Sequence, residues 1–326
     1  MSARSSFYWT LPVAGDGPGA ARDPEAHPSP SEAFADARRG RFDLYDYLLQ
    51  VARAARVAGF DGLYVPWDEE GQDPWIATAS LARRIDKLLF VPQVQPGFAT
   101  PVYFAKLAAT FRRFAGERLA YALDLSLPVQ RRHALADARQ NSEFLERAAE
   151  FVEATAGVAS QTSYDFEGRH FQVQSGGLQA PLGARPPLRV FTSGNGDDLV
   201  AFAGAHSDVH LLDWDAEITT SLARLRASAD AAGRQVAAGV RATLIARHDE
   251  EEAQRVAAEA GTPAHQRRSL IVGSYQQVAQ RIDELSALGV EHFVLDASPR
   301  LEEAYRFGER VLPLLRHNRP LGQRVA

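Results

Sequence analysis

The sequence predicts an α/β protein built on a closed (β/α)8 TIM barrel, with eight parallel strands each followed by a helix. Short apolar runs rich in Val, Leu and Phe alternate with amphipathic stretches along all 326 residues. A parallel sheet covered by helices requires this alternation, and a barrel is the simplest closure for eight units in this length. An open doubly wound sheet is the alternative. We expect one domain over residues 1–326.

Each expected strand is a short apolar run bounded by turn residues. The eight runs are Phe7–Val13, Gly62–Pro66, Leu88–Gln95, Leu119–Leu125, Leu188–Ser193, Asp208–Trp214, Val240–Arg247 and His292–Ala297. The amphipathic stretches between them are the expected helices. They are Asp43–Ala58, Asp73–Arg83, Pro101–Phe114, Ser142–Ala156, Asp197–Ala205, Ala216–Ala232, Ser274–Leu288 and Leu301–Leu315.

Three irregular regions interrupt this alternation, as insertions after strands 1, 4 and 7. They are Gly15–Arg41, Ser160–Pro187 and Asp249–Val272. The second contains a predicted hairpin with its turn near Glu167-Gly168. Loops after the carboxyl ends of barrel strands surround the active site, so the first and third regions are expected on the functional face.

Composition excludes several classes of function. The chain has no cysteine, a net charge of −5, scattered Lys and Arg, and no apolar run long enough to span a bilayer. These features argue against disulfides, thiol nucleophiles, nucleic-acid binding and membrane insertion. The N-terminus does not resemble a signal peptide, and the absence of cysteine favours a reducing cytoplasm. Nine dispersed histidines form no cluster at metal-ligand spacing, and no metal is predicted.

Arg241 is the first candidate for a functional residue, because it interrupts the apolar run 240–245. A charge inside such a strand costs several kcal/mol, on the order of 3 or more, unless an anion meets it. That partner is either a structural carboxylate or a ligand, and both remain open. Asp213 lies at the end of an earlier strand. Its carboxylate could serve acid–base chemistry, but a solvated loop charge is the commoner explanation.

The turn Thr192–Asp197, "TSGNGD", is the second candidate. Glycines between a strand and a helix N-terminus leave backbone N–H groups available for an anion, although a tight turn with an aspartate N-cap is the commoner explanation of the pattern. Aromatic residues also lie in or just after three strands, namely Trp9, Tyr64, Trp67 and Trp214. Together they favour a planar aromatic ligand at the barrel mouth, and core packing is the alternative.

Several segments in order along nearly the whole chain resemble one family. They include "FYWTLPVAGDG", "AGFDGLYVPWDEEGQDPW", "QPGFATPVYFAKLAATFRRFAGERLAY", "YDFEGRHFQV", "GVRATLIAR", "VAQRIDELSALGVEHFVL" and "PRLEEAYRFGERVLPLL". The chain is similar to the bacterial-luciferase-like monooxygenases, and closest to the FMN-dependent alkanesulfonate monooxygenase branch. This resemblance implies a barrel fold and reduced FMN supplied by a separate flavin reductase. It further implies O2 activation as a flavin C4a-peroxide, with attack on a small, possibly sulfonate-like, organic substrate.

The resemblance also implies roles for particular residues. Arg241 matches an arginine that helps hold the sulfonate or the oxygenated flavin, and Trp214 and Trp9 match tryptophans on strands 6 and 1. Arg300 would add positive charge. The flavin phosphate would bind the turn Ser193, Gly194, Asn195 and Gly196, and Asp124 and Ser126 would lie near the flavin.

Departures from the family pattern leave alternatives open. Polar family positions are occupied here by Ala14, Gly71, Ala122, Thr243 and Ser298, and the lid loop after strand 7 is shortened. A non-catalytic partner subunit is therefore one alternative, and an F420-dependent oxidoreductase is another. The resemblance further implies a homodimer or homotetramer.

Overall fold

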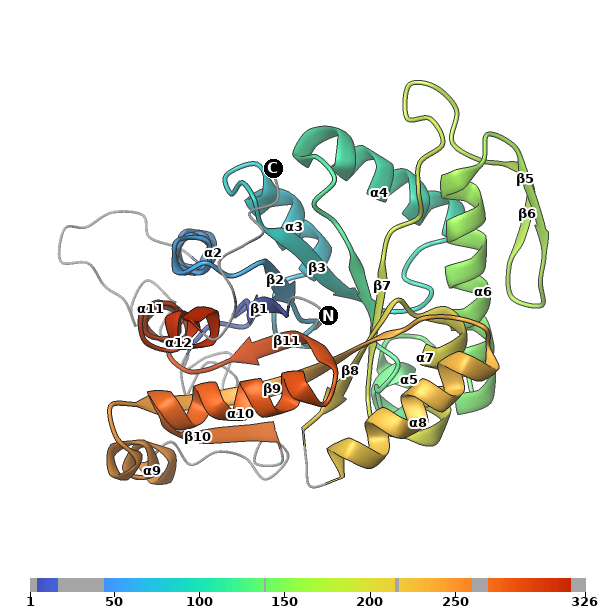
Figure 1. The fold of residues 1–326 in the computed structure, drawn as a ribbon. Coiled ribbons are helices and arrows are strands. Elements are labelled where there is room, and N and C mark those ends of the chain that lie inside the picture. Colours follow the sequence, from blue (N-terminus) through green and yellow to red (C-terminus); the bar gives the residue numbers. More distant parts are fainter. Residues whose placement is uncertain (1–4, 17–43, 138, 215–216, 260–268, 318–326) are drawn as a thin grey trace.

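The centre of the computed structural model, which describes residues 5–16, 44–137, 139–214, 217–259 and 269–317, is a closed barrel of parallel strands (Figure 1). Its strands are β1 (Ser6–Thr10), β2 (Gly62–Val65), β3 (Leu89–Val94), β4 (Tyr121–Leu123), β7 (Val190–Ser193), β8 (Val209–Asp213), β9 (Ala237–Arg247) and β11 (Val290–Asp296). They pair in this order, and β11 returns to β1. The predicted (β/α)8 barrel is confirmed, and the open sheet is excluded.

Side chains alternate along each strand between the barrel interior and the surrounding helices. The interior holds a layer of apolar side chains that includes Tyr8, Val91, Phe191 and Leu211. The ring of Tyr8 meets the edge of the Phe191 ring at a centroid distance of 5.8 Å. The lower barrel is therefore a packed core, and a ligand can enter only above it.

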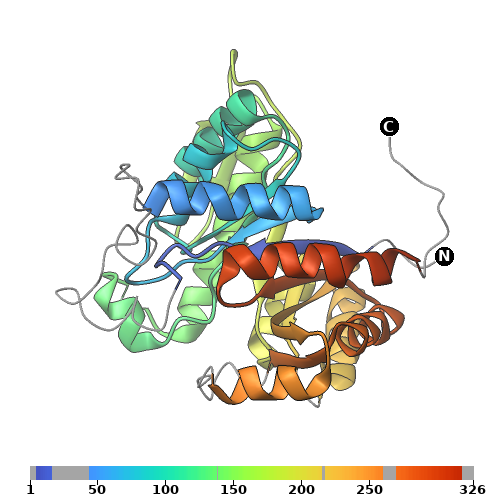
Figure 2. The same cartoon turned by 90° about the vertical axis from the view of Figure 1, so that its left-hand side faces the viewer.

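Helices surround the barrel in the order that the sequence predicts (Figure 1). The eight expected helices are observed as α2 (Leu44–Ala58), α3 (Pro74–Ala82), α4 (Pro101–Ala115), α6 (Asn141–Ser160), α7 (Asp197–His206), α8 (Ile218–Ala231), α10 (Tyr275–Ala287) and the pair α11 (Arg300–Arg310) and α12 (Leu312–His317). The last expected helix is thus divided at Val311. Figure 2 shows α2 and α11 side by side over β1. None of the described helices has the length and apolar character needed to cross a membrane.

Local sequence signals explain where several helices begin and end. Asp73 caps α3 by accepting from the Ile76 N–H at 2.8 Å, and Pro74 occupies the first turn, where its missing N–H costs nothing. Ser274 and Gln277 form a capping box at the start of α10. Gly289, with φ of 97°, ends that helix in the left-handed conformation that glycine adopts without strain.

Three described elements were not expected from the sequence: α5 (Val129–Ala134), α9 (Glu250–Glu259) and β10 (Leu270–Ser274). The segment Asp249–Val272 was expected to be irregular, and this expectation is wrong for its described parts, which form α9 and the start of β10. That the lid loop is shortened stays a prediction. Helix α9 buries only Ala253, so it lacks the apolar stripe that identifies a helix. Strand β10 pairs with the outer half of β9, beyond the closed barrel. The predicted insertion after strand 1 lies largely outside the described residues.

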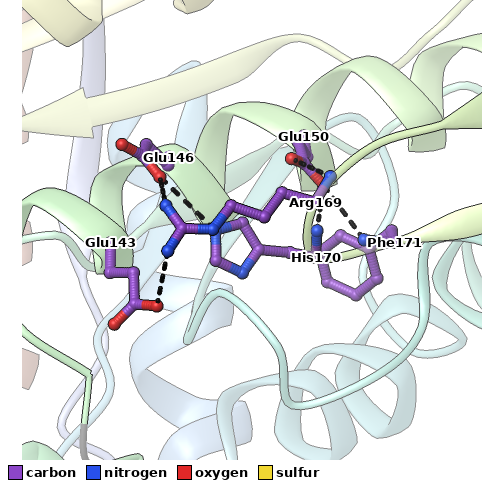
Figure 3. Close-up of polar contacts among 6 residues, drawn as sticks. All are labelled: Glu143, Glu146, Glu150, Arg169, His170 and Phe171. Atoms are coloured by element: carbon purple, nitrogen blue, oxygen red, sulfur yellow. Dashed lines mark hydrogen bonds and ion pairs between the residues drawn. The ribbon is translucent and has the colours of Figure 1, made fainter.

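The predicted hairpin is confirmed as β5 (Tyr164–Glu167) and β6 (Gln172–Gly176), and its turn is docked on α6 (Figure 3). One carboxylate oxygen of Glu150 accepts the N–H groups of His170 and Phe171, and the other accepts that of Arg169. Partial burial acts to raise the pKa of Glu150, but these backbone donors hold it below its usual value. The Arg169 guanidinium contacts Glu146 and Glu143 in addition.

A buried ion pair joins the end of β9 to α11. Arg247 Nη2 lies 3.0 Å from Glu303 Oε1, and Nη1 donates to Oε2 at 3.1 Å. The two residues are 8% and 5% exposed, so neither charge is solvated in the folded protein. Removing Glu303 would leave the charge of Arg247 buried without a carboxylate partner, whereas Glu303 itself also pairs with Arg306 at 3.1 Å.

Replacing Glu303 by Gln should therefore lower the free energy of unfolding by about 3 kcal/mol, since a buried Arg247 would lose its counter-charge. Urea denaturation followed by circular dichroism measures this change. Asp86→Asn removes the partner of Arg56 from a surface pair and is the control, with an expected change of about 0.5 kcal/mol or less. Equal losses in the two variants would contradict the assignment of the buried pair.

Candidate active site

The candidate site lies at the mouth of the barrel, above the apolar interior. Four polar side chains face inward here: Tyr64 from β2, Asp124 just after β4, Asp213 from β8 and Arg241 from β9. Each lies at the carboxyl end of its strand or beside one, where barrel active sites form. Burial, with the neighbouring Asp124 and Asp213 carboxylates, raises the pKa of Tyr64 to about 12, against an opposing effect of Arg241. The Tyr64 hydroxyl is therefore a neutral group near pH 7.

Arg241 meets a carboxylate from the neighbouring strand. Its Nη2 and Nε donate to Asp213 Oδ1 at 2.7 and 3.2 Å. Burial acts to lower the pKa of Arg241, but Asp213 raises it above its usual range, so the guanidinium stays charged. The Arg241 side chain is nevertheless 33% exposed, and no described residue accepts from its Nη1. The structural partner is now identified, and one face of the guanidinium is left for a ligand.

Asp124 is held rigidly beside this pair. Its Oδ1 accepts from the Ser126 hydroxyl at 3.1 Å and from the Ser126 N–H at 3.3 Å. Its Oδ2 accepts from Gln95 Nε2 at 2.9 Å. Asp124 is only 5% exposed, and these donors offset the cost of burying its charge. Sequence reasoning identified Asp124 and Ser126 but missed Gln95, because a glutamine after a strand carries no distinctive signal.

Arg300 is placed at the mouth by two carboxylates. Its Nη1 lies 3.1 Å from Asp16 Oδ1, and its Nε lies 2.8 Å from Asp296 Oδ1. Burial raises the pKa of Asp296, Arg300 lowers it, and Asp16 raises it further, with a net increase. Tyr47 donates its hydroxyl to Asp16 Oδ2 at 2.6 Å. The predicted role of Arg300 toward an anion is untested, and its charge is shared between two side chains that sequence reasoning missed.

The turn after β7 forms a backbone cradle at the start of α7. Gly194 has a φ of 126°, and α7 begins at the N-cap Gly196 without a side-chain cap. The Asn195 amide is used elsewhere, since it donates to the Asp213 carbonyl at 3.1 Å and accepts from the Asp213 N–H at 2.9 Å. An uncapped helix N-terminus attracts an anion, so this turn fits the phosphate of a flavin nucleotide.

Two charged groups modify that cradle. Asp197 and Asp198 lie in the first turn of α7, where their charge opposes a phosphate. Arg224 of α8 forms an ion pair with Asp197 and also donates to the Asn195 carbonyl at 3.4 Å. This contact neutralises one of the two carboxylates beside the predicted phosphate position.

Buried His210 supports the turn from the helix side. Its Nε2 lies 2.8 Å from the Gly194 carbonyl, which can only accept, so Nε2 carries the proton. Its Nδ1, 2.8 Å from Thr192 Oγ1, must then accept from that hydroxyl. Burial lowers the pKa of His210 to about 4, and the Gly194 carbonyl opposes this only in part. Neutral His210 therefore fixes the backbone of the cradle.

The aromatic residues do not gather as a wall around the mouth. Trp9 is fully buried among core side chains, its ring 5.0 Å from that of Phe60, and its indole N–H donates to the Arg300 carbonyl. Trp214 packs against the helix-side core, with the Arg281 guanidinium 4.7 Å from its ring. The predicted catalytic role of Trp214 is untested. For Trp9 the alternative of core packing is confirmed.

One cavity adjoins this site, and a second lies away from it. One, of about 270 Å3, opens beside the ends of β2 and β3 and includes Trp67 and Gln95 in its lining. The other, of about 460 Å3, lies between α4 and α6 near the start of β7 and contains none of the predicted site residues. In the described part of the chain, no three His, Asp or Glu side chains are grouped to hold a metal ion.

Residues 22–268 match the luciferase-like monooxygenase family. The chain belongs to this family. Its resemblance to the family is thereby confirmed, and the chain is an enzyme of the luciferase-like monooxygenase class. The matched range includes Asp124, the turn at 193–196, Asp213 and Arg241.

Three solved structures share the fold at low sequence identity. EDTA monooxygenase from Chelativorans sp. BNC1 has a TM-score of 0.80 at 18% identity, covering 97% of this chain and 94% of that one. Long-chain alkane monooxygenase has a TM-score of 0.75 at 14% identity, covering 98% and 92%. An F420-dependent secondary alcohol dehydrogenase has a TM-score of 0.70 at 15% identity, covering 96% and 99%.

His210 makes this luciferase-like enzyme sensitive to acid. An unfolded histidine takes up a proton near pH 6.5, whereas folded His210 does so only near pH 4, so the free energy of unfolding falls as the pH drops between these values. His210→Gln retains a donor for the Gly194 carbonyl and should reduce that loss by about 2–3 kcal/mol. Chemical denaturation between pH 7 and 4.5 measures it. Exposed His248→Gln is the control, and parallel curves for wild type and His210→Gln would contradict the assignment.

Proposed function

We propose that the protein is a monooxygenase that uses reduced FMN, supplied by a separate flavin reductase, and O2 to oxidise a small organic substrate. The observation that carries this proposal is the polar mouth, where Arg241 presents an unused Nη1 beside Tyr64 and Asp124. Family membership supports it, as do relatives whose names describe monooxygenases. A preference for alkanesulfonates, by resemblance to that branch, is part of the proposal.

The cofactor would be held from two sides. The backbone of Ser193, Gly194, Asn195 and Gly196 would bind its phosphate, helped by the uncapped N-terminus of α7. Asp124, with Ser126, would face the flavin ring, because its carboxylate is buried and held by hydrogen bonds at the mouth. When bound, reduced FMN supplies the electrons that activate O2.

Arg241 would position an anionic group of substrate or stabilise negative charge that develops in the reaction. Its pKa lies above the usual range, so it acts as a donor and not as a proton carrier. Its fixed contact with Asp213 holds the guanidinium plane in place before a ligand arrives. Arg300 would contribute more weakly, because Asp16 and Asp296 already share its charge.

Family membership favours an enzyme, and the alternative left open by the sequence is a partner subunit without catalytic activity. The observation that favours it is the pairing of both mouth arginines with carboxylates, which reduces the charge available to a substrate. Steady turnover by the purified homo-oligomer, which we expect to be a dimer or tetramer, would exclude this candidate. The likeness to an F420-dependent dehydrogenase makes F420 the alternative cofactor. Parallel anaerobic titrations with reduced FMN and reduced F420 distinguish the two.

Gly194→Ala should weaken binding of reduced FMN by about tenfold, because an added Cβ would lie 2.4 Å from Leu199 Cδ1 and the φ of 126° disfavours other residues. Binding of reduced riboflavin, which has no phosphate, should change much less. Anaerobic fluorescence titration measures both affinities. Gly233→Ala is the matched control, since Gly233 also has a positive φ but its Cβ would meet nothing within 4 Å. Equal FMN affinities in the two variants would contradict the phosphate assignment.

Arg241→Gln should lower kcat about a hundredfold in a reductase-coupled assay, since one preorganised charged donor is lost at the reacting centre. Arg56→Gln, on the outer surface of α2, is the control and should leave turnover unchanged. Sulfonate-dependent release of sulfite reports on the substrate class, and a variant as active as wild type would remove Arg241 from the mechanism.

A further inference from the structure

Three arginines that the proposed function does not use surround the smaller cavity. We define the arginine pocket as the cavity of about 270 Å3 lined by Arg132, Asp137, Arg139 and Arg147 together with Trp67, Gln95, Pro96, Gly97, Phe98, Leu135, Ala136 and Phe144. Three cations and one carboxylate among its lining residues give it a formal charge of +2. The barrel mouth has the opposite sign, because Asp16, Asp124, Asp213 and Asp296 outnumber Arg241 and Arg300 there.

Each arginine is fixed in place by contacts with neighbouring residues, and the buried Arg132 keeps one donor without a described partner. Arg132 is 2% exposed, and its guanidinium lies 4.4 Å from the Phe144 ring. Its Nη1 donates to the Arg139 carbonyl at 3.0 Å and its Nη2 donates to Asn141 Oδ1, whereas its Nε has no described partner. Arg139 Nη1 donates to Asp137 Oδ1 at 2.9 Å, and its side chain is still 36% exposed. A buried cation without a carboxylate partner is costly, and an anion in the adjoining cavity would offset part of that cost through its charge.

Arg147 is held by the loop after β3. Its Nη1 donates to the Pro96 carbonyl at 2.7 Å and lies 3.7 Å from Asp137 Oδ2. Gly97 makes this approach possible, because a Cβ there would lie 1.5 Å from Nη1. Burial lowers the pKa of Arg147 and neighbouring Arg139 lowers it further, against the effect of Asp137. The three like charges therefore repel one another, and one carboxylate compensates them incompletely.

The pocket adjoins the candidate active site. Gln95 lines the pocket and donates to Asp124, and Trp67, which also lines it, donates its backbone N–H to Gln93 Oε1 at 2.9 Å. A ligand could thus place its reactive part above Asp124 and its charged end among the arginines. Exposed Phe98 and half-buried Trp67 offer apolar surface to the part in between.

We propose that the arginine pocket binds an oxyanion group of the substrate: a carboxylate, a sulfonate or a phosphate. That the bound group belongs to the substrate rests on the proposed function, because the same arginines could hold the phosphate of the flavin. The charged end of the substrate is then bound in a cavity that carries excess positive charge, and of its two proposed roles Arg241 keeps the stabilisation of negative charge that develops at the mouth. Arginine forks match the planar or tetrahedral arrangement of oxyanion oxygens.

Isothermal titration of the flavin-free protein with benzenesulfonate and with benzyl alcohol tests the proposal. We expect the sulfonate to bind about tenfold more tightly than the neutral ring, and Arg139→Gln and Arg132→Gln each to weaken it about tenfold. Arg131→Gln is the matched control. Arg131 lies on α5 beside Arg132, but it forms an ion pair with Glu69 and does not line the pocket. Arg139 is partly exposed, so its variant should fold even where the buried Arg132 variant does not. Equal sulfonate affinity in Arg139→Gln, Arg131→Gln and wild type would overturn the proposal.

A second titration distinguishes the two sources of the oxyanion. If the pocket holds substrate, Arg139→Gln leaves the affinity for reduced FMN unchanged; if it holds the flavin phosphate, that variant weakens FMN but not riboflavin. The first result supports the proposal, whereas the second retains an oxyanion site but overturns its assignment to the substrate. Failure of FMN to bind at all, with sulfonate binding intact, would contradict the proposed function and leave the pocket standing.

Discussion

The parallel pairing of β8 with β9 sets Asp213 beside Arg241, with both side chains facing the barrel interior. A slip of one residue would turn Arg241 toward the apolar layer between strands and helices and would bring Val240 inside. The charge would then be buried without its carboxylate, at a cost on the order of several kcal/mol. The site therefore depends on this register, and the ion pair in turn opposes any other register.

The elements that the sequence predicted well are those with strong local signals. Eight apolar runs and eight amphipathic stretches are confirmed as strands and helices because burial on one or both faces requires those patterns. The missed helix α9 buries a single alanine, although Asp249 accepts from the Glu252 N–H at 2.8 Å and so provides a capping signal. The short helix α5 offered no periodicity to detect.

The site was harder to predict, and the reason is physical. Strands buried on both faces show no alternation, so nothing in the run around Trp9 tells which side chains face inward. Arg241 could be recognised because a charge in such a run is exceptional. Its partner Asp213 could not be chosen among many carboxylates, because the pairing follows from strand register between distant segments. The grouping of Arg132, Arg139 and Arg147 likewise arises only when α5, α6 and the loop after β3 come together.

The hairpin β5–β6 is joined to the mouth of the barrel by a chain of contacts. Glu150 holds the Phe171 backbone (Figure 3), the Phe171 ring lies 5.1 Å from the Arg147 guanidinium, and Arg147 holds the carbonyl of Pro96. A surface segment that does not line the arginine pocket thus supports the loop beside Gln95 through these contacts. In evolutionary terms the hairpin is a place where ligand preference can drift while the residues around Asp124 and Arg241 stay unchanged.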